Sequence, residues 1–193
     1  PWRGNKKDPN YPYKVLVSEF MLQQTGVKTV IPYFENFIAK WPDISSLAKA
    51  SENEILKYWQ GLGYYSRGRN LLKTAQIINL DYNGIIPSNL DDLLSLPGIG
   101  EYASAAIRSI AFDKKATVID GNVKRVIARF FALNGKLKDN EKDISSLAKY
   151  LTPNKGNANY SQAIMELGAL ICRPKQSNCS DCVVSHKCLS LKK

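Results

Sequence analysis

The chain has 193 residues, enough for one large domain or two small ones, and a chain of this length buries roughly 70% of its unfolded surface. Hydrophobic residues make up 44% of it and charged residues 23%, which excludes a disordered tail, a coiled coil and a collagen-like repeat. No apolar run reaches the roughly 18 residues of a membrane span. The 27 Lys and Arg outnumber the 17 Asp and Glu, and the net charge of +10 favours a polyanionic partner, nucleic acid ahead of a membrane surface.

Most of the chain carries apolar residues three and four positions apart, the spacing of amphipathic helices. The segment 14–22 is ambiguous, because its valines favour a strand and the following Met-Leu-Gln-Gln favours a helix. Residues 117–119 could form a short strand, but the balance predicts an all-α fold. Asp43, Ser51 and Asn159 are residues typical of the position just before a helix begins. Helices are predicted over 44–59, 66–80, 90–96, 101–112, 122–133, 143–151 and 159–171.

The heptapeptide Asp-Ile-Ser-Ser-Leu-Ala-Lys occurs twice, at 43–49 and at 143–149. The flanking residues do not match, and the segment is a generic capped amphipathic helix. We interpret the recurrence as coincidence and not as an internal duplication.

Four cysteines lie close to the end of the chain with the spacing C-x6-C-x2-C-x5-C: Cys172, Cys179, Cys182 and Cys188. Without a secretion signal, disulfides are disfavoured, and four thiolates in one short segment fit zinc or an iron–sulfur cluster. Zinc sites usually use two close pairs, so the wide arms favour [4Fe–4S] over zinc and over four structural thiols. Arg173, Lys175 and Lys187 are interleaved and are candidates for phosphate contacts.

His186 is the only histidine, and it lies between two of the cysteines. Four thiolates already complete a tetrahedral site, so a solvated surface position is the favoured interpretation and a metal ligand the alternative. A catalytic Ser-His-Asp arrangement is disfavoured for the same reason.

The sequence Leu96-Pro-Gly-Ile-Gly-Glu-Tyr102 joins two predicted helices by a tight turn. Gly98 and Gly100 let the backbone approach a ligand closely and leave N–H groups free at a helix start, which suits phosphate oxygens. In a basic protein this pattern indicates a helix-hairpin-helix grip on the DNA backbone; an ordinary helix–helix turn is the alternative.

Three carboxylates stand in apolar surroundings: Glu19, Asp120 and Glu166. A buried carboxyl group can keep its proton near neutral pH, and two carboxyl groups in different environments can divide the roles of acid and anion. The sequence does not show whether Glu19 and Asp120 act together.

Taken together, the cysteine spacing, the LPGIG hairpin and an Asp about twenty residues after it resemble the endonuclease III superfamily of DNA glycosylases. Ser18-Glu-Phe-Met-Leu-Gln-Gln-Thr25, Gly61-Leu-Gly-Tyr-Tyr-Ser-Arg67 and Ile119-Asp-Gly-Asn-Val-Lys-Arg125 are similar to the adenine DNA glycosylase (MutY) branch. The similarity extends from Pro1 to Cys188. It is the combination that is specific, and no single motif is.

The resemblance implies an all-α fold of two helical lobes with DNA bound in the cleft between them. A six-helix barrel with the hairpin would span 13–114, and an iron–sulfur domain would combine 1–12 with 115–193. The chain would lack the first helix that usually precedes Pro1-Trp-Arg3. It would also lack the C-terminal domain by which full-length relatives check for 8-oxoguanine, which would weaken the preference for 8-oxoguanine over guanine.

The implied reaction is hydrolysis of the bond between adenine and its sugar, where adenine is mispaired with 8-oxoguanine or guanine. Glu19 would protonate adenine at N7, Asp120 would stabilise the sugar cation, and Asn122 would help to position the site. A general acid is needed because adenine leaves poorly as an anion, and a fixed anion stabilises an oxocarbenium-like transition state.

Further site residues follow from the same resemblance. Gln24 and Tyr64 would intercalate into the duplex, where a flat amide and a ring can stack on bases. Core packing is the alternative for Trp2 and Leu22, and a buried polar pair is the alternative for Gln162 and Glu166. The substrate- and DNA-binding set is Trp2, Arg3, Leu22, Gln23, Gln24, Tyr64, Pro97, Gly98, Gly100, Gln162 and Glu166.

Tyr102 decides a subclass. Relatives that also cut the strand carry a Schiff-base Lys just after the hairpin, where this chain has Tyr102 and no Lys between Lys73 and Lys114. The resemblance therefore implies a monofunctional enzyme that leaves an abasic site. It would be a monomer acting on double-stranded DNA, without a membrane partner and cytoplasmic if bacterial. A thymine or uracil mismatch glycosylase and a non-catalytic iron–sulfur DNA-binding module are the alternatives.

Overall fold

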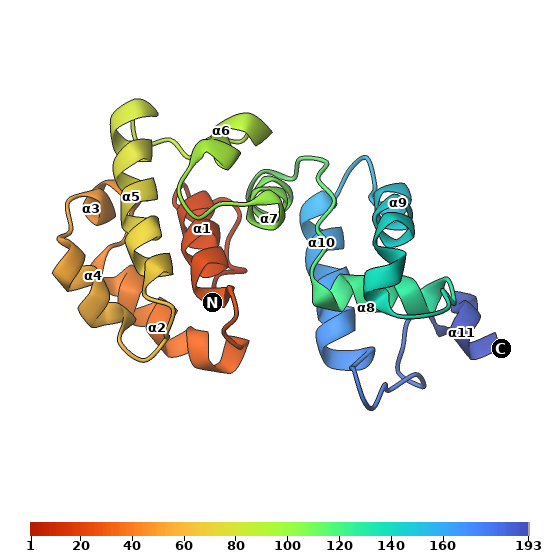
Figure 1. The fold of residues 1–193 in the computed structure, drawn as a ribbon. Coiled ribbons are helices and arrows are strands. Elements are labelled where there is room, and N and C mark those ends of the chain that lie inside the picture. The colour runs from red at the N-terminus through yellow and green to blue at the C-terminus, as the bar shows by residue number, and fades with distance from the viewer. Residues whose placement is uncertain (193) are drawn as a thin grey trace. The chain divides into compact units, whose positions relative to one another are not determined.

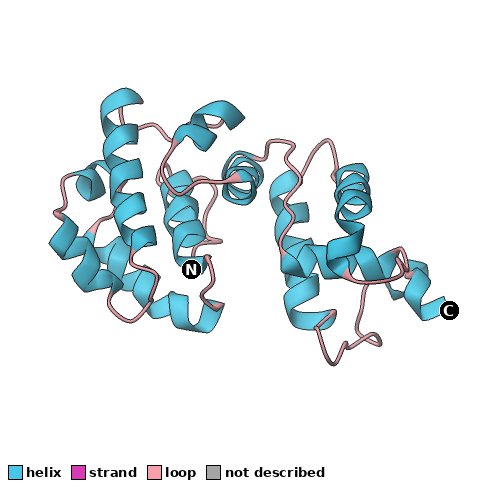
Figure 2. Ribbon diagram, in the orientation of Figure 1, coloured by secondary structure: helices cyan, strands magenta, loops and turns pink. Residues whose placement is uncertain are grey.

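The structure is a computed structural model that describes residues 1–192. It divides the chain into two compact units, Pro1–Phe112 and Asp113–Lys193, here called unit 1 and unit 2. Every regular element of the described residues is helical (Figure 2), which confirms the all-α prediction. None of the helices in residues 1–192 is long and apolar enough to cross a bilayer.

Helix α1 runs through the middle of unit 1, where it contacts α2, α5 and α7 (Figure 1). Nine of its twelve residues are buried. A helix buried on all sides has no polar face, and for that reason its sequence lacked a clear helical period. The helices of unit 1 are α1 (Tyr11–Leu22), α2 (Val27–Lys40), α3 (Ile44–Ala48), α4 (Glu52–Trp59), α5 (Ser66–Asp81), α6 (Leu90–Ser95) and α7 (Glu101–Phe112).

Two features of unit 1 differ from the sequence-based expectation. The single helix predicted over 44–59 is two helices, because Asp43 and Ser51 each form a complete capping box and so each starts a helix. Helix α2 was not predicted; it contains Pro32, a residue that argues against a helix interior.

Unit 2 is built on α8, which contacts α9, α10 and α11. Its apolar core consists of Val123, Ile127, Ala128, Ile144 and Ala148. The elements of unit 2 are α8 (Gly121–Phe130), the 3-10 helix η1 (Leu137–Asn140), α9 (Glu141–Leu151), α10 (Asn157–Glu166), the π-helical turn η2 (Leu167–Ile171), the 3-10 helix η3 (Ser185–Lys187) and α11 (Leu189–Lys192).

In unit 2 one alternative that the sequence left open is settled, and one predicted helix start was wrong. Residues 117–119 are a loop and not a strand. Helix α10 begins at Asn157 and not after Asn159. Gly156, directly before it, has a left-handed φ of 73°, and this conformation sets the start of the helix.

The structure groups residues 1–12 with unit 1, whereas the resemblance grouped them with the cluster domain. The ring of Trp2 packs edge-on against Phe34 of α2, with the ring centroids 5.4 Å apart. Assignment of residues 1–12 to the cluster domain stays a prediction.

Candidate active-site residues in the two units

The hairpin lies between α6 and α7, as its sequence predicted. Gly98 has a left-handed φ of +80°, and a Cβ atom there would come within 2.9 Å of Asn70 Cβ and of Phe20 Cε1. A Cβ atom on Gly100 would meet nothing within 4 Å. The first glycine is therefore required by the fold, whereas the second leaves open space for a ligand.

Side chains of α5 and of the segment after α1 donate hydrogen bonds to the backbone of the hairpin. The Thr74 hydroxyl donates to the carbonyl of Pro97 at 2.9 Å, and the Gln23 amide donates to the carbonyl of Gly98 at 3.3 Å. Leu96 and Ile99 are buried on either side of the turn. These contacts fix the backbone that a phosphate would meet.

Glu19 lies on α1 and is only 6% exposed. Arg3 is near it: partial burial lowers the pKa of the Arg3 guanidinium, and the charges of Glu19, Tyr11 and Tyr102 oppose that effect. Tyr102 is the second residue of α7. Unit 1 thus brings three predicted site residues, Arg3, Glu19 and Tyr102, into one neighbourhood.

The other predicted residues of unit 1 fall into two groups. Trp2 is 9% exposed and packs on Phe34, as the core-packing alternative requires, and Leu22 is the half-buried last residue of α1. Gln24 and Tyr64, by contrast, are exposed and have positive φ angles of 59° and 46°. Both are therefore accessible to a macromolecular ligand.

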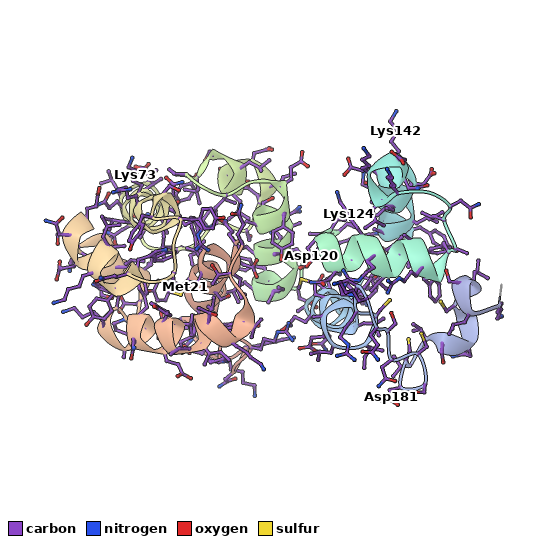
Figure 3. The ribbon with its side chains drawn as sticks, turned by 60° about the horizontal axis from the view of Figure 1, so that its bottom comes forward. Met21, Lys73, Asp120, Lys124, Lys142 and Asp181 are labelled. Carbon is purple, nitrogen blue, oxygen red and sulfur yellow. The ribbon has the colours of Figure 1, made fainter. Side chains whose placement is uncertain are left out.

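In unit 2, Asp120 is the N-cap of α8, and Figure 3 shows it at the start of that helix. One carboxylate oxygen accepts the Val123 N–H at 2.7 Å, and the other accepts the Asn122 side-chain amide at 2.9 Å. Both bonds fix the direction of the carboxylate. Asp120 and Asn122, predicted as a pair, contact each other directly.

Arg125 continues this network toward the cysteine segment. Its guanidinium donates to Asn122 Oδ1 at 2.9 Å, to the Gly168 carbonyl at 2.7 Å and to the Cys172 carbonyl at 2.8 Å. Gly168 must lack a side chain, since a Cβ atom there would be 2.6 Å from Asn122 Cβ.

Gln162 and Glu166 are not both buried, contrary to the alternative considered above. The Gln162 amide donates to the Ala158 carbonyl of its own helix at 2.8 Å, and Glu166 is exposed. Apolar neighbours in the sequence suggested burial of Glu166, but on a helix they lie on other faces.

The four cysteines are free thiols, each half-buried. The Arg129 guanidinium lies 3.4 Å from Cys172 Sγ and also donates to the carbonyls of Arg173 and Pro174. In residues 1–192 no three acidic, His or Cys side chains gather as a metal-binding group, so the cluster stays a prediction. His186 is exposed, as its favoured interpretation required.

The cysteine segment nevertheless has the composition that a bound cluster would suit. No described residue from 169 to 192 is buried, so this segment has no apolar core of its own. Four thiol donors are the ligand set of a [4Fe–4S] cluster, and ligands can replace apolar packing in holding a chain together. The donor chemistry therefore fits the predicted cofactor.

Sequence reasoning missed three arginines that organise these segments: Arg67, Arg125 and Arg129. Arg67 and Arg125 lie within the motifs quoted above, but the motifs assigned them no role. The sequence gives little indication of these roles. Their acceptors are mostly backbone carbonyls, which every residue has, so no pattern of side chains marks them.

A family described as HhH-GPD superfamily base excision DNA repair protein matches residues 17–153. The chain is 42% identical to the adenine DNA glycosylase of Buchnera aphidicola subsp. Schizaphis graminum, covering 100% of this chain and 55% of that protein. It is 40% identical to the adenine DNA glycosylase of Homo sapiens, covering 97% of this chain and 36% of that protein. The chain thus spans about half the length of the bacterial relative and about a third of the length of the human one.

Two solved structures are similar over nearly the whole chain. A thermostable thymine-DNA glycosylase superposes with a TM-score of 0.84 at 31% identity, covering 100% of this chain and 88% of that one. A non-covalent endonuclease III–DNA complex superposes with a TM-score of 0.76 over 94% of this chain and 84% of that one, and at 22% identity it shows likeness of fold alone.

Proposed function

The chain belongs to the HhH-GPD superfamily of base excision DNA repair proteins, and from this premise we propose that it is a monofunctional adenine DNA glycosylase. Its substrate is double-stranded DNA in which adenine is mispaired with 8-oxoguanine or guanine. The proposal rests first on Glu19, a carboxyl group buried on α1 inside the motif shared with that branch. Identities of 40–42% to adenine DNA glycosylases support the same branch.

Glu19 acts as the general acid in this proposal. Adenine leaves as a neutral base only if a proton reaches its N7 as the glycosidic bond breaks, and a carboxyl group in buried surroundings can carry that proton near neutral pH. Arg3 lies near Glu19 and Tyr102, since its guanidinium interacts electrostatically with both. Because Tyr102 takes the place of a Schiff-base lysine, the product is an abasic site and not a cut strand.

Asp120 stabilises the positive charge that develops on the sugar. Its carboxylate is held by the Val123 N–H and the Asn122 amide, so it need not reorganise when the charge appears. Asn122 is in turn held by Arg125.

DNA binding uses backbone and stacking contacts. The hairpin at Pro97–Gly100 presents an open glycine to phosphate oxygens, and Gln24 and Tyr64 fill the space left by the extruded adenine. Arg173, Pro174, Lys175 and Gln176 line a hollow of about 390 Å³ on the cysteine segment, and its two cations suit a further phosphate.

Cys172, Cys179, Cys182 and Cys188 hold a [4Fe–4S] cluster in this proposal. Bound by these four thiolates, residues 172–188 would be ordered and would present their cationic side chains to the DNA. Arg129 donates to the Arg173 and Pro174 carbonyls and supports the same segment from α8.

The second candidate is a thymine mismatch glycosylase, which the 31% identity to the thermostable thymine-DNA glycosylase favours. Base release decides between the two. Duplexes that pair A with 8-oxoguanine, A with G, T with G, and A with T are incubated with the protein and read with and without alkali. We expect cleavage of the A strand after alkali only, at 8-oxoguanine or G; release of T instead would establish the second candidate.

A further inference from the structure

Arg67 is a buried cation that anchors two separate backbone segments of unit 1. It lies in the first turn of α5 and is only 6% exposed. Nη1 donates to the carbonyls of Phe20, Met21 and Gln23, and Nη2 donates to the Thr25 hydroxyl; these acceptors form a first group. Nη2 also donates to the carbonyls of Leu62 and Gly63, which form a second group.

The first group of acceptors closes the end of α1. The carbonyls of Phe20 and Met21 are among the last four of that helix and have no partner within it. A guanidinium there meets the negative end of the helix dipole, and α1 has no basic residue of its own in its last turn. Its bonds to Met21 at 2.8 Å and to Thr25 at 3.0 Å lie on either side of Gln24.

The second group of acceptors lies directly before Tyr64. Bonds of 3.1 Å to Leu62 and 3.2 Å to Gly63 fix the chain at that point. The guanidinium carbon also lies 5.5 Å from the Tyr64 ring centroid and 5.6 Å from that of Trp59, within cation–π range. One side chain therefore holds both segments that carry the proposed intercalating residues.

Both of those residues have strained backbones. Gln24 has a φ of 59° and Tyr64 a φ of 46°, a region that residues other than glycine seldom adopt. Such conformations persist only where the surrounding contacts over-determine them. The bonds from Arg67 lie on either side of Gln24 and directly before Tyr64, and they supply that constraint.

We propose that Arg67 is a positioning residue that holds Gln24 and Tyr64 at a fixed separation, so that the wedge that enters the duplex is formed before DNA binds. This inference rests on the proposed function and adds to it a residue that touches neither base nor sugar. A lysine would not substitute, because its single ammonium cannot span two groups of carbonyls as the two terminal nitrogens of arginine do.

Arg67→Lys tests the proposal, with Arg69→Lys as the matched control. Arg69 lies two residues further along α5, is exposed and pairs with Glu52 at 2.8 Å. Thr25→Val is a milder variant, since it removes one acceptor on the Gln24 side only. Circular dichroism and the melting temperature of each variant report folding.

Two substrates separate positioning from folding. Single-turnover release of adenine is measured from two duplexes. In the first the adenine lies opposite 8-oxoguanine; in the second it lies opposite an abasic-site analogue, so that extruding the adenine costs less free energy. For Arg67→Lys we expect a roughly 10- to 100-fold loss on the first substrate, the size of one stacking contact, and less than about 3-fold on the second. Thr25→Val should show the same pattern in smaller measure, and Arg69→Lys should match the wild type.

A 2-aminopurine placed beside the mispaired adenine gives a readout that needs no chemistry. Its fluorescence should rise when wild-type protein unstacks the step and should rise less with Arg67→Lys. Adding Arg67→Lys to a Gln24→Ala, Tyr64→Ala double variant should lower the rate no further, because the residues it positions are gone.

Equal losses on both substrates, or full additivity with the double variant, would mean that Arg67 only stabilises the fold and would overturn the proposal. If wild-type protein unstacks the duplex but releases no base, the proposed function fails while Arg67 is still tested by fluorescence. If it unstacks no duplex, the wedge itself is refuted.

Discussion

The proposed acid Glu19 lies on a helix buried at the centre of unit 1, whereas the predicted cluster ligands of unit 2 lie on a segment in which no described residue is buried. Unit 1 fixes its site by apolar packing and by one buried arginine that binds carbonyls. Unit 2 fixes its C-terminal segment by two half-exposed arginines, Arg125 and Arg129. Apolar packing thus orders the functional residues of unit 1, whereas the proposed cluster would order the C-terminal segment of unit 2. Removal of the cluster should therefore damage unit 2 only.

The largest effect is expected from Glu19→Gln. Removing the proton donor should slow adenine release about 10²- to 10⁴-fold, while DNA affinity and the melting temperature are kept, since the amide has the same shape. Single-turnover kinetics and a binding isotherm with the 8-oxoguanine duplex measure both. A variant that releases adenine at the wild-type rate would remove Glu19 from the mechanism.

Loss of the cluster should affect unit 2 and leave unit 1 unchanged. Cys179→Ser is expected to lower DNA affinity at least about tenfold and to reduce the folded yield, because residues 169–192 have no buried core to hold them without a ligand. Hydrogen exchange should increase in unit 2 and stay unchanged on α1. Wild-type affinity and exchange in a cluster-free protein would show that the arginine bonds suffice.

Glycine substitutions compare steric tolerance in the two units. Gly168→Ala would place a Cβ atom 2.6 Å from Asn122 Cβ and 3.0 Å from its backbone carbonyl oxygen, so we expect a loss of about 1–3 kcal/mol in the free energy of unfolding and a slower reaction. Gly98→Ala should cost a similar amount in unit 1, through strain at φ +80°. Gly100→Ala, which has open space, should melt like the wild type and lose DNA affinity only. Denaturant titrations of the three variants check this order.

The smallest effect on the free energy of unfolding is expected at the cap of α8. Asp120→Ala should lower the free energy of unfolding by about 1 kcal/mol, because the N-cap acceptor is lost. Asp120→Asn should keep the helix cap and lose only the acceptor of the Asn122 amide, so it should destabilise less than alanine does, yet slow base release as strongly. If both variants keep full activity, Asp120 is a cap and nothing more.

Much of the fold followed from local patterns. The spacing of apolar residues predicted α5, α7 and α9 closely, and the start signals Asp43 and Ser51 both cap helices. These features depend on residues within one or two turns, which a sequence displays directly. Helix α1 was ambiguous because its burial on all sides is a property of its neighbours.

Less of the candidate site could be predicted. Motif resemblance located Glu19 and Asp120 but gave no reason to single out Arg67, whose acceptors lie up to 47 residues away. The positive φ angles of Gln24 and Tyr64 are equally invisible in the sequence, since neither residue is a glycine. Glu166 was expected in apolar surroundings and is exposed.

The repeated heptapeptide shows where local information ends. At 43–49 its Asp43 caps a helix of five residues and Leu47 is fully buried. At 143–149 the same seven residues lie inside the eleven-residue helix α9, where Ala148 is buried and Leu147 only half-buried. The sequence by itself determined that both copies are helical; the elements packed against each copy decided where the helix begins and which face is buried, because burial depends on neighbours that the heptapeptide does not encode.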